Sequence, residues 1–216
     1  MDGTGVLFTP FAAILPSHVH SKIIPLIQKV GLSYSEQAEY VATKIENRSV
    51  IVAESYSGMV AFELCRRFPE KVEQVIFVAS FISRPSQLAK IGENIPLQLL
   101  RLVKRPNWLV LKVLFGSKLN KLSKELFLRT MSCVPTELLK YRLKQISQLK
   151  TPEIELSVPC TYLLARQDRL VSRNVLDVFR RNFSKVSVYE LEGTHFLIQT
   201  NPEGVWDVIK AIVSHT

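Results

Sequence analysis

A serine between an apolar β-branched run and a helical pattern is the residue best suited to nucleophilic chemistry in this chain. Residues 50–53 are followed by Glu54 and Ser55, and helical periodicity begins at Tyr56. This order predicts a nucleophile elbow, a strained strand-to-helix turn that exposes a serine hydroxyl. Ala53 and Ser57 stand where the motif G-x-S-x-G has glycine. Both are small, and smallness is what lets the backbone pass without collision.

Two residues downstream supply the partners that such a serine requires. A serine hydroxyl is a weak nucleophile, so it needs an imidazole to take its proton and a carboxylate to orient that imidazole. Asp168 follows an apolar run at 160–165, and His195 follows one at 186–191. Each residue alone fits a structural role, as a helix cap, a turn former or a loop histidine. Their chain order, each at the end of a strand, predicts a Ser55–His195–Asp168 triad at one sheet edge.

Strands and helices alternate along the sequence in a way that positions these loops. We expect strands at 22–27, 49–53, 75–79, 160–165 and 186–191, with Pro25 restricting the first to an edge or an end. Helices are predicted at 33–47, 56–68 and 174–182, and a last helix opens with Asn201 and Pro202. Ser33 and Glu36 have the spacing of a capping box. This alternation predicts an α/β fold with a parallel sheet.

The segment 82–150 has a different character. Its pattern is helical, is broken by Gly116 and several prolines, and contains no convincing strand, which predicts an inserted helical cap. It carries 14 Lys and Arg against 3 Glu, a net charge of +11, whereas the rest of the 216-residue chain sums to −2. Two explanations stay open: a solvated helical face, or a docking surface for an acidic protein or anionic lipid.

Composition narrows the class of protein. The length suits one domain with a sizeable core, and 47% hydrophobic with 22% charged residues is ordinary globular composition. Cys65, Cys133 and Cys160 lack disulfide or zinc spacing and indicate reduced thiols in a cytoplasmic protein. No signal peptide and no 18-residue apolar run is present, so no membrane span is expected. No metal or organic cofactor is expected, and no motif points to nucleic acid.

The elbow and the two loops resemble those of the α/β-hydrolase superfamily, particularly small intracellular carboxylesterases such as the pimeloyl-carrier-protein methyl ester esterases. The similar segments are 2–8, 52–58, 164–168 and 192–196. The resemblance implies an α/β-hydrolase fold with a mainly parallel sheet and flanking helices. Residues 1–81 and 151–216 would form its core, and residues 82–150 a helical lid over an acyl pocket.

The resemblance also implies where the oxyanion would be held, and it exposes a departure. One donor would be the N–H of Tyr56, and the other would come from the loop at 2–5, where Met1 stands at the donor position beside Asp2. The strand expected upstream, next to the elbow strand, is absent, and its loss would leave unpaired backbone groups and an uncovered apolar edge. We therefore expect an N-terminally truncated sequence. The rival interpretation is a complete chain that replaces this strand by dimerisation or by a rearranged edge.

These residues predict a serine hydrolase that cleaves carboxylic esters or acyl thioesters, either small or carrier-bound, through an acyl-enzyme. The alternative is a catalytically impaired binding protein that docks an acidic carrier protein through its basic lid. Phe196 and lid residues are candidates for lining the acyl pocket, although ordinary packing explains most of the lid set equally well. The lid candidates are Leu97, Leu99, Leu100, Trp108, Leu111, Leu114 and Phe115.

Overall fold

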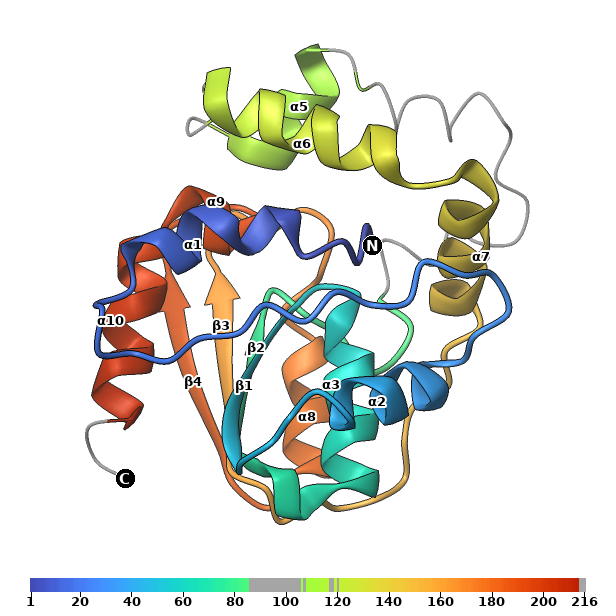
Figure 1. The fold of residues 1–216 in the computed structure, drawn as a ribbon, viewed down its shortest axis with the longest axis vertical. Coiled ribbons are helices and arrows are strands. Elements are labelled where there is room, and N and C mark those ends of the chain that lie inside the picture. The colour runs from blue at the N-terminus through green and yellow to red at the C-terminus, as the bar shows by residue number, and fades with distance from the viewer. Residues whose placement is uncertain (86–105, 107, 117–118, 120, 214–216) are drawn as a thin grey trace.

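A four-stranded parallel sheet forms the centre of the computed structural model, which describes residues 1–85, 106, 108–116, 119 and 121–213 (Figure 1). The spatial order of its strands is their order along the chain. Parallel strands need crossover connections, and helices supply them here. All four strands were predicted, although β2 begins three residues earlier than expected. They are β1 (Ser49–Glu54), β2 (Val72–Val78), β3 (Cys160–Ala165) and β4 (Val186–Leu191).

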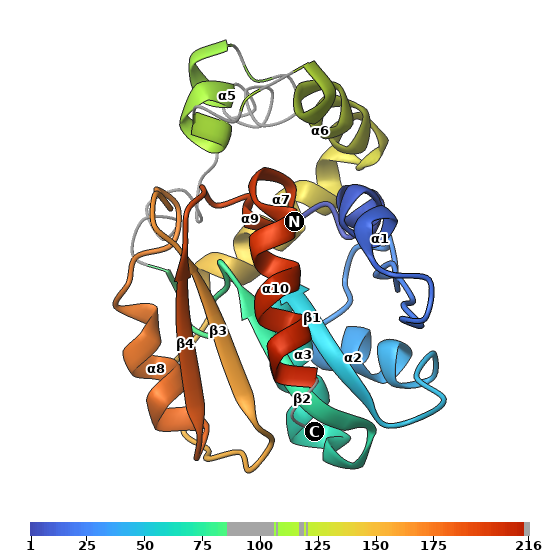
Figure 2. The ribbon, with the colours of Figure 1, turned by 90° about the vertical axis from the view of Figure 1, so that its left-hand side faces the viewer.

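Helices cover both faces of this sheet (Figures 1 and 2). One face carries α2 (Tyr34–Ala42), α3 (Ser57–Arg67) and α8 (Val175–Asn182). The other carries α1 (Thr9–Ile14), α9 (Leu197–Thr200) and α10 (Pro202–Val213). Two short 3₁₀ turns, η1 (Val6–Phe8) and η2 (Pro69–Lys71), precede α1 and β2.

The side chains of β2 show how the two faces are filled. Val75 and Phe77 pack with Phe179 of α8 in one buried cluster, whereas Ile76 and Val78 pack with residues of α9 and α10 in another. Successive residues of a strand point to opposite faces, so the apolar part of β2, residues 75–78, is covered on both sides. That explains why residues 75–78 form an unbroken hydrophobic run in the sequence.

Both predicted helix caps are present. The Ser33 hydroxyl accepts from the Glu36 N–H at 3.2 Å, and the Glu36 carboxylate accepts from the Ser33 N–H at 2.8 Å. The Asn201 side chain accepts from the Gly204 N–H at 3.1 Å. The first of these helices is nevertheless shorter than predicted, since α2 ends at Ala42 rather than at residue 47.

The prediction of a strand at 22–27 is wrong. The segment is irregular, and Pro25 within it has no N–H to give to a ladder. Its last residue, Ile27, exchanges backbone hydrogen bonds with the side chain of Gln37 instead of with a strand, at 2.9 and 3.0 Å. The helical segment before it, η1 and α1, was not predicted.

The described part of the segment 82–150 is helical and contains no strand. It forms α5 (Trp108–Phe115), α6 (Lys121–Cys133) and α7 (Thr136–Ser147), which lie beyond the carboxyl ends of the strands in Figure 1. Three residues suggested as pocket lining, Leu97, Leu99 and Leu100, lie outside the described residues.

The three cysteines are free thiols, with Cys65 and Cys160 buried and Cys133 exposed. Burial raises the pKa of the Cys65 thiol to about 12, so this group stays protonated and unreactive at neutral pH. Within the described residues, no helix has the length and apolar character needed to cross a bilayer.

Candidate active site

Ser55 lies in the strained turn that its sequence context predicts. Its φ angle is 55°, a left-handed conformation that is rare for residues other than glycine. The Ser55 N–H donates to the Val78 carbonyl at 3.1 Å, which continues the β1–β2 ladder to the turn. The next residues begin α3, whose Gly58 donates its N–H to the Ser55 carbonyl at 3.0 Å. The turn is therefore held by the sheet on one side and by the helix on the other.

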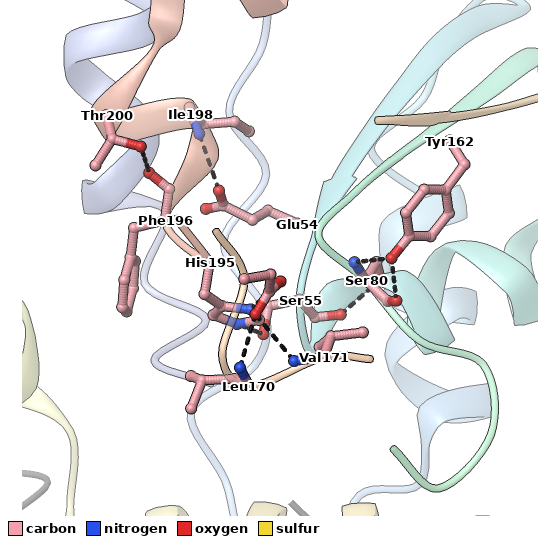
Figure 3. Close-up of polar contacts among 11 residues, drawn as sticks. Glu54, Ser55, Ser80, Tyr162, Leu170, Val171, His195, Phe196, Ile198 and Thr200 are labelled. Atoms are coloured by element: carbon pink, nitrogen blue, oxygen red, sulfur yellow. Dashed lines mark hydrogen bonds and ion pairs between the residues drawn. The ribbon is translucent and has the colours of Figure 1, made fainter. Parts of the chain in front are cut away.

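A close approach behind the turn explains the glycine at position 58, which directly follows the five residues of the motif. A Cβ atom on Gly58 would lie 1.7 Å from the hydroxyl oxygen of Ser80, so no larger residue fits there. That hydroxyl donates to the Ser55 carbonyl at 2.8 Å, and the backbone of Ser80 is in turn bonded to the Tyr162 hydroxyl (Figure 3). The hydrogen bonds of Ser80 and Tyr162 thus fix the elbow, and the sequence pattern alone did not indicate them.

The structure brings Ser55, His195 and Asp168 together. The Nε2 atom of His195 lies 2.8 Å from the Ser55 hydroxyl oxygen, and its Nδ1 atom lies 3.0 Å from Oδ2 of Asp168. Both the imidazole and the carboxylate are almost fully buried, with side-chain exposures of 6% and 3%. The other oxygen of Asp168 accepts from the N–H groups of Leu170 and Val171, at 2.8 and 2.9 Å. These bonds fix the carboxylate that faces the imidazole.

Glu54, the residue before Ser55, ties the elbow to the loop that carries His195. Its buried carboxylate accepts from the Ile198 N–H at 3.1 Å (Figure 3) and from the Gln199 side-chain amide at 3.0 Å, and both donors lie in α9. Burial raises the pKa of Glu54 to about 7, and the hydrogen bonds from Gln199 and Ile198 limit that rise. Sequence reasoning missed this role, although an acidic residue at the end of an apolar strand is itself an unusual feature.

Two residues that line the same cavity as Ser55 have backbone N–H groups without a hydrogen-bond partner among the described residues. One such group belongs to Tyr56 at the N-terminus of α3, and the other to Asp2. His195 also lines this cavity. The α-amino group of Met1 lies there too, and burial lowers its pKa. Free N–H groups beside a nucleophile are the kind of donor that holds an oxyanion.

Arg142 of α7 fixes the conformation of the segment that contains Asp2. Its buried guanidinium donates to the carbonyls of Met1 and Asp2 at 2.8 and 2.7 Å, and to Ile27 at 3.2 Å. In a trans peptide the C=O and N–H point in opposite directions, so holding the Met1 carbonyl turns the Asp2 N–H away from Arg142. A Cβ atom on Gly3 would lie 2.8 Å from the guanidinium, which explains a glycine with φ 62°. Nothing in the sequence distinguished Arg142 from the other basic residues of its segment.

A cavity of about 1290 Å³ opens beside Ser55 and His195. Of the proposed pocket residues, Phe196 and Leu114 line it, whereas Leu111 and Phe115 are buried outside its lining. Phe115 stacks on Phe196, with ring centroids 4.7 Å apart. Trp108 is 65% exposed and does not line the cavity. Apolar residues of α6 and α7 that the sequence did not single out complete the upper wall: Phe127, Met131, Leu143 and Ile146.

Within the described residues, no group of three or more His, Cys, Asp and Glu side chains is arranged to hold a metal ion. The groups gathered around Ser55 are its own hydroxyl, an imidazole hydrogen-bonded to a buried carboxylate, and backbone N–H groups.

Comparison with solved structures defines the fold. The chain superposes with a TM-score of 0.72 on Est816, described as an N-acyl homoserine lactone degrading enzyme, covering 98% of this chain and 89% of that one at 15% identity. A marine microorganism esterase also gives 0.72, covering 97% and 91% at 12% identity. MGS-M2, an α/β hydrolase enzyme from a deep-sea metagenome library, gives 0.65, covering 87% and 75% at 16% identity. The chain therefore has the α/β-hydrolase fold, as predicted.

Sequence comparison adds a likeness to part of one long protein. No family model matches the chain. It is 27% identical over 165 residues to the AMB antimetabolite synthetase AmbE of Pseudomonas aeruginosa. This alignment includes 74% of the chain but spans only 7% of the synthetase, so it concerns a small part of a much longer protein.

Proposed function

We propose that the chain is a serine hydrolase that cleaves carboxylic esters or acyl thioesters through an acyl-enzyme. The observation that carries this proposal is the hydrogen-bonded series from Asp168 through His195 to Ser55, with the serine in a left-handed turn. The α/β-hydrolase fold and the esterases and lactone-degrading enzyme that share it support a hydrolytic reaction. That support comes by analogy of fold.

In this mechanism the Ser55 oxygen attacks the acyl carbonyl carbon while its proton passes to Nε2 of His195. Asp168 keeps Nδ1 protonated and stabilises the imidazolium. The N–H groups of Tyr56 and Asp2 donate to the oxyanion. His195 then gives its proton to the leaving alkoxide or thiolate, and the acyl group stays on Ser55. Water, deprotonated by His195, attacks this acyl-enzyme and releases the carboxylic acid.

The lining of the cavity favours an apolar acyl group. The upper wall next to His195 comes from α6 and α7 and is apolar, so burying a hydrocarbon chain there is favourable by about 0.8 kcal/mol per CH₂ group. In this proposal the segment 82–150 acts as a lid that shapes the acyl pocket. The likeness to part of a synthetase is the reason to test a thioester alongside an oxygen ester.

A fluorophosphonate probe and p-nitrophenyl butyrate test the proposal together. The chain should label covalently and hydrolyse the ester, and Ser55→Ala should lose the label and reduce kcat by at least about 10⁴-fold. An S-acyl N-acetylcysteamine of the same acyl length tests the thioester. Equal rates for the chain and Ser55→Ala, with both folded by circular dichroism, would remove the proposal.

A second candidate is a binding protein that docks an acidic carrier through the 82–150 segment. The observation in its favour is a set of exposed cations on α5, α6 and α7. They are Lys112, Lys121, Lys124, Arg129, Lys140 and Lys144. Binding to an acidic acyl carrier protein that weakens steeply between 50 and 500 mM salt, without labelling of Ser55, would favour this candidate.

A further inference from the structure

The two outer strands of the sheet have opposite characters. β4 carries Ser187, Tyr189 and Glu190, and the last of these is paired with Arg166 and Arg173. Charged and polar side chains are the usual protection of a solvent-exposed edge. β1 has no such protection. Residues 50–53 are Val-Ile-Val-Ala, a composition typical of a strand with a neighbour on each side.

The backbone of β1 has hydrogen-bonding groups without partners. Within the described residues β1 pairs only with β2. The N–H of Ser55 points to β2, and parallel strands alternate, so the groups of Val50, Val52 and Glu54 point to the other side. No described residue bonds to the backbone N–H and C=O groups of Val50 and Val52, whereas the Glu54 carbonyl accepts from the Ser57 hydroxyl at 2.8 Å. Within an apolar environment each unpaired group costs about 1–3 kcal/mol.

A groove long enough for an extended chain lies along the unpaired side of β1. The cavity beside Ser55 continues along β1 to Ser49, and the segment 15–26 bounds it opposite the strand. Its walls are apolar on both faces, with Phe11 and Trp206 on one side and Val60 and Leu64 on the other. A volume of about 1290 Å³ is enough for several residues of extended chain. An acyl chain would fit this space, but it would leave the β1 backbone groups unpaired.

We propose that this groove receives an extended strand of another polypeptide, which pairs with β1 and becomes the fifth strand of the sheet. Such β-augmentation satisfies backbone groups through the peptide ladder and takes its specificity from the flanking pockets. β1 has six residues, so a strand that pairs with its whole length has about six, and these are apolar because both walls of the groove are apolar. Basic side chains line its end near Ser49, namely Lys22, Lys44, Arg48 and Lys210, against Glu46 and Glu73. A strand parallel to β1 would therefore carry acidic residues before its apolar run.

The probe is an acetylated, fluorescein-labelled peptide of two aspartates followed by six alternating valine and isoleucine residues. Its binding is measured by fluorescence anisotropy. Two N-methylated versions, at the odd and at the even positions of the apolar run, are matched in composition. Only one set of N–H groups faces β1, so one version should bind at least about tenfold more weakly than the other. Equal binding of the two versions would overturn strand pairing.

A pair of protein variants tests the same contact from the other side. Val52→Pro removes an N–H that points away from β2, a position that tolerates proline on an edge, whereas Val52→Ala keeps that N–H. We expect Val52→Pro to weaken peptide binding at least tenfold and Val52→Ala by less than threefold. If Val52→Pro does not fold, the N-methylated peptides still decide the question.

Two other occupants are distinguished in the same experiments. Palmitate that displaces the peptide and binds Val52→Pro as well as the native chain would assign the groove to an acyl chain and overturn the proposal. A dimer in light scattering that Val52→Pro dissociates would assign it to a second copy and also overturn it. A monomer that binds the peptide and shows the N-methyl asymmetry supports it.

Discussion

The two sides of the Ser55 hydroxyl are held by different kinds of contact. On one side, the loops of Asp168 and His195 follow adjacent strands and are bonded to each other, since Gln167 donates its N–H to the Gly193 carbonyl at 2.9 Å. On the other side, the segment with Asp2 is held by the side chain of Arg142, 140 residues away in the sequence. In the proposed mechanism, the side that transfers the proton thus depends on the sheet, and the side that holds the oxyanion depends on α7.

Asp168→Asn should give the largest effect, because it changes the side held by the sheet. The amide still accepts from Leu170 and Val171, so the loop keeps its shape, but it no longer fixes the imidazole tautomer. We expect kcat for p-nitrophenyl butyrate to fall by about 10⁴-fold with an unchanged melting temperature. A loss smaller than tenfold would show that His195 does not depend on this carboxylate.

Arg142→Met should affect the segment that contains Asp2 while leaving Ser55, His195 and Asp168 in place. Releasing the carbonyls of Met1 and Asp2 frees the Asp2 N–H to turn, and losing one oxyanion donor costs about 10²–10³-fold in turnover. We expect kcat to fall by about 100-fold with KM nearly constant, because the lost contact forms in the transition state.

Tyr141→Phe is the matched control for this prediction. Tyr141 lies beside Arg142 on α7 and donates its hydroxyl to the Leu32 carbonyl at 3.3 Å, so its loss loosens the same helix without touching Asp2. It should keep kcat within about threefold. Equal losses in both variants would mean that α7 acts by general packing and not through the Asp2 peptide.

The difference between contacts that depend on the sheet and the contact made by Arg142 also explains which residues could be predicted from the sequence. The four strands of the sheet were predicted, and so were the loops after them that carry Ser55, Asp168 and His195, because a strand end fixes where the next residue lies and parallel strands bring such ends to one edge. The parallel α/β architecture followed from the same pattern, and the resemblance of the elbow and the two loops to α/β-hydrolases supplied the particular fold. Arg142 could not be found this way, because its partners are backbone carbonyls that any residue possesses.

Two predictions failed, the strand at 22–27 and Trp108 as pocket lining, because local contacts decided both. The run 22–27 is apolar enough for a strand, but Gln37 satisfies its backbone and Pro25 cannot join a ladder. Trp108 was assigned to a pocket because it is aromatic and close in sequence to apolar residues. In the structure it lies at the surface, with the Lys112 ammonium 4.9 Å from the centre of its ring. Which face of a helix meets the cavity depends on packing that composition does not specify.

Glu54→Gln tests the link between the elbow and α9 through pH. The folded pKa of about 7 lies above the ordinary 4.5, so between these values the folded protein holds a proton that the unfolded chain has lost. The free energy of unfolding should therefore fall as pH rises from 4.5 to 7, by up to about 1.4 kcal/mol per unit. Glu54→Gln should lack this slope in urea titrations, whereas Glu70→Gln, at an exposed site, should retain it. Parallel slopes for the chain and Glu54→Gln would contradict the raised pKa.

Trp108→Ala should have the smallest effect, because this side chain takes no part in either side of the site. It is 65% exposed and its ring contact with Lys112 is a surface cation–π pair, worth about 0.5–1 kcal/mol. We expect kcat/KM for p-nitrophenyl hexanoate to change by less than twofold.

Phe196→Leu provides the contrast, because Phe196 lines the cavity and packs edge-on against His195 with ring centroids 5.6 Å apart. It should raise KM severalfold in the same assay. A larger loss in Trp108→Ala than in Phe196→Leu would mean that the acyl group binds against the outer face of α5 and not within the cavity.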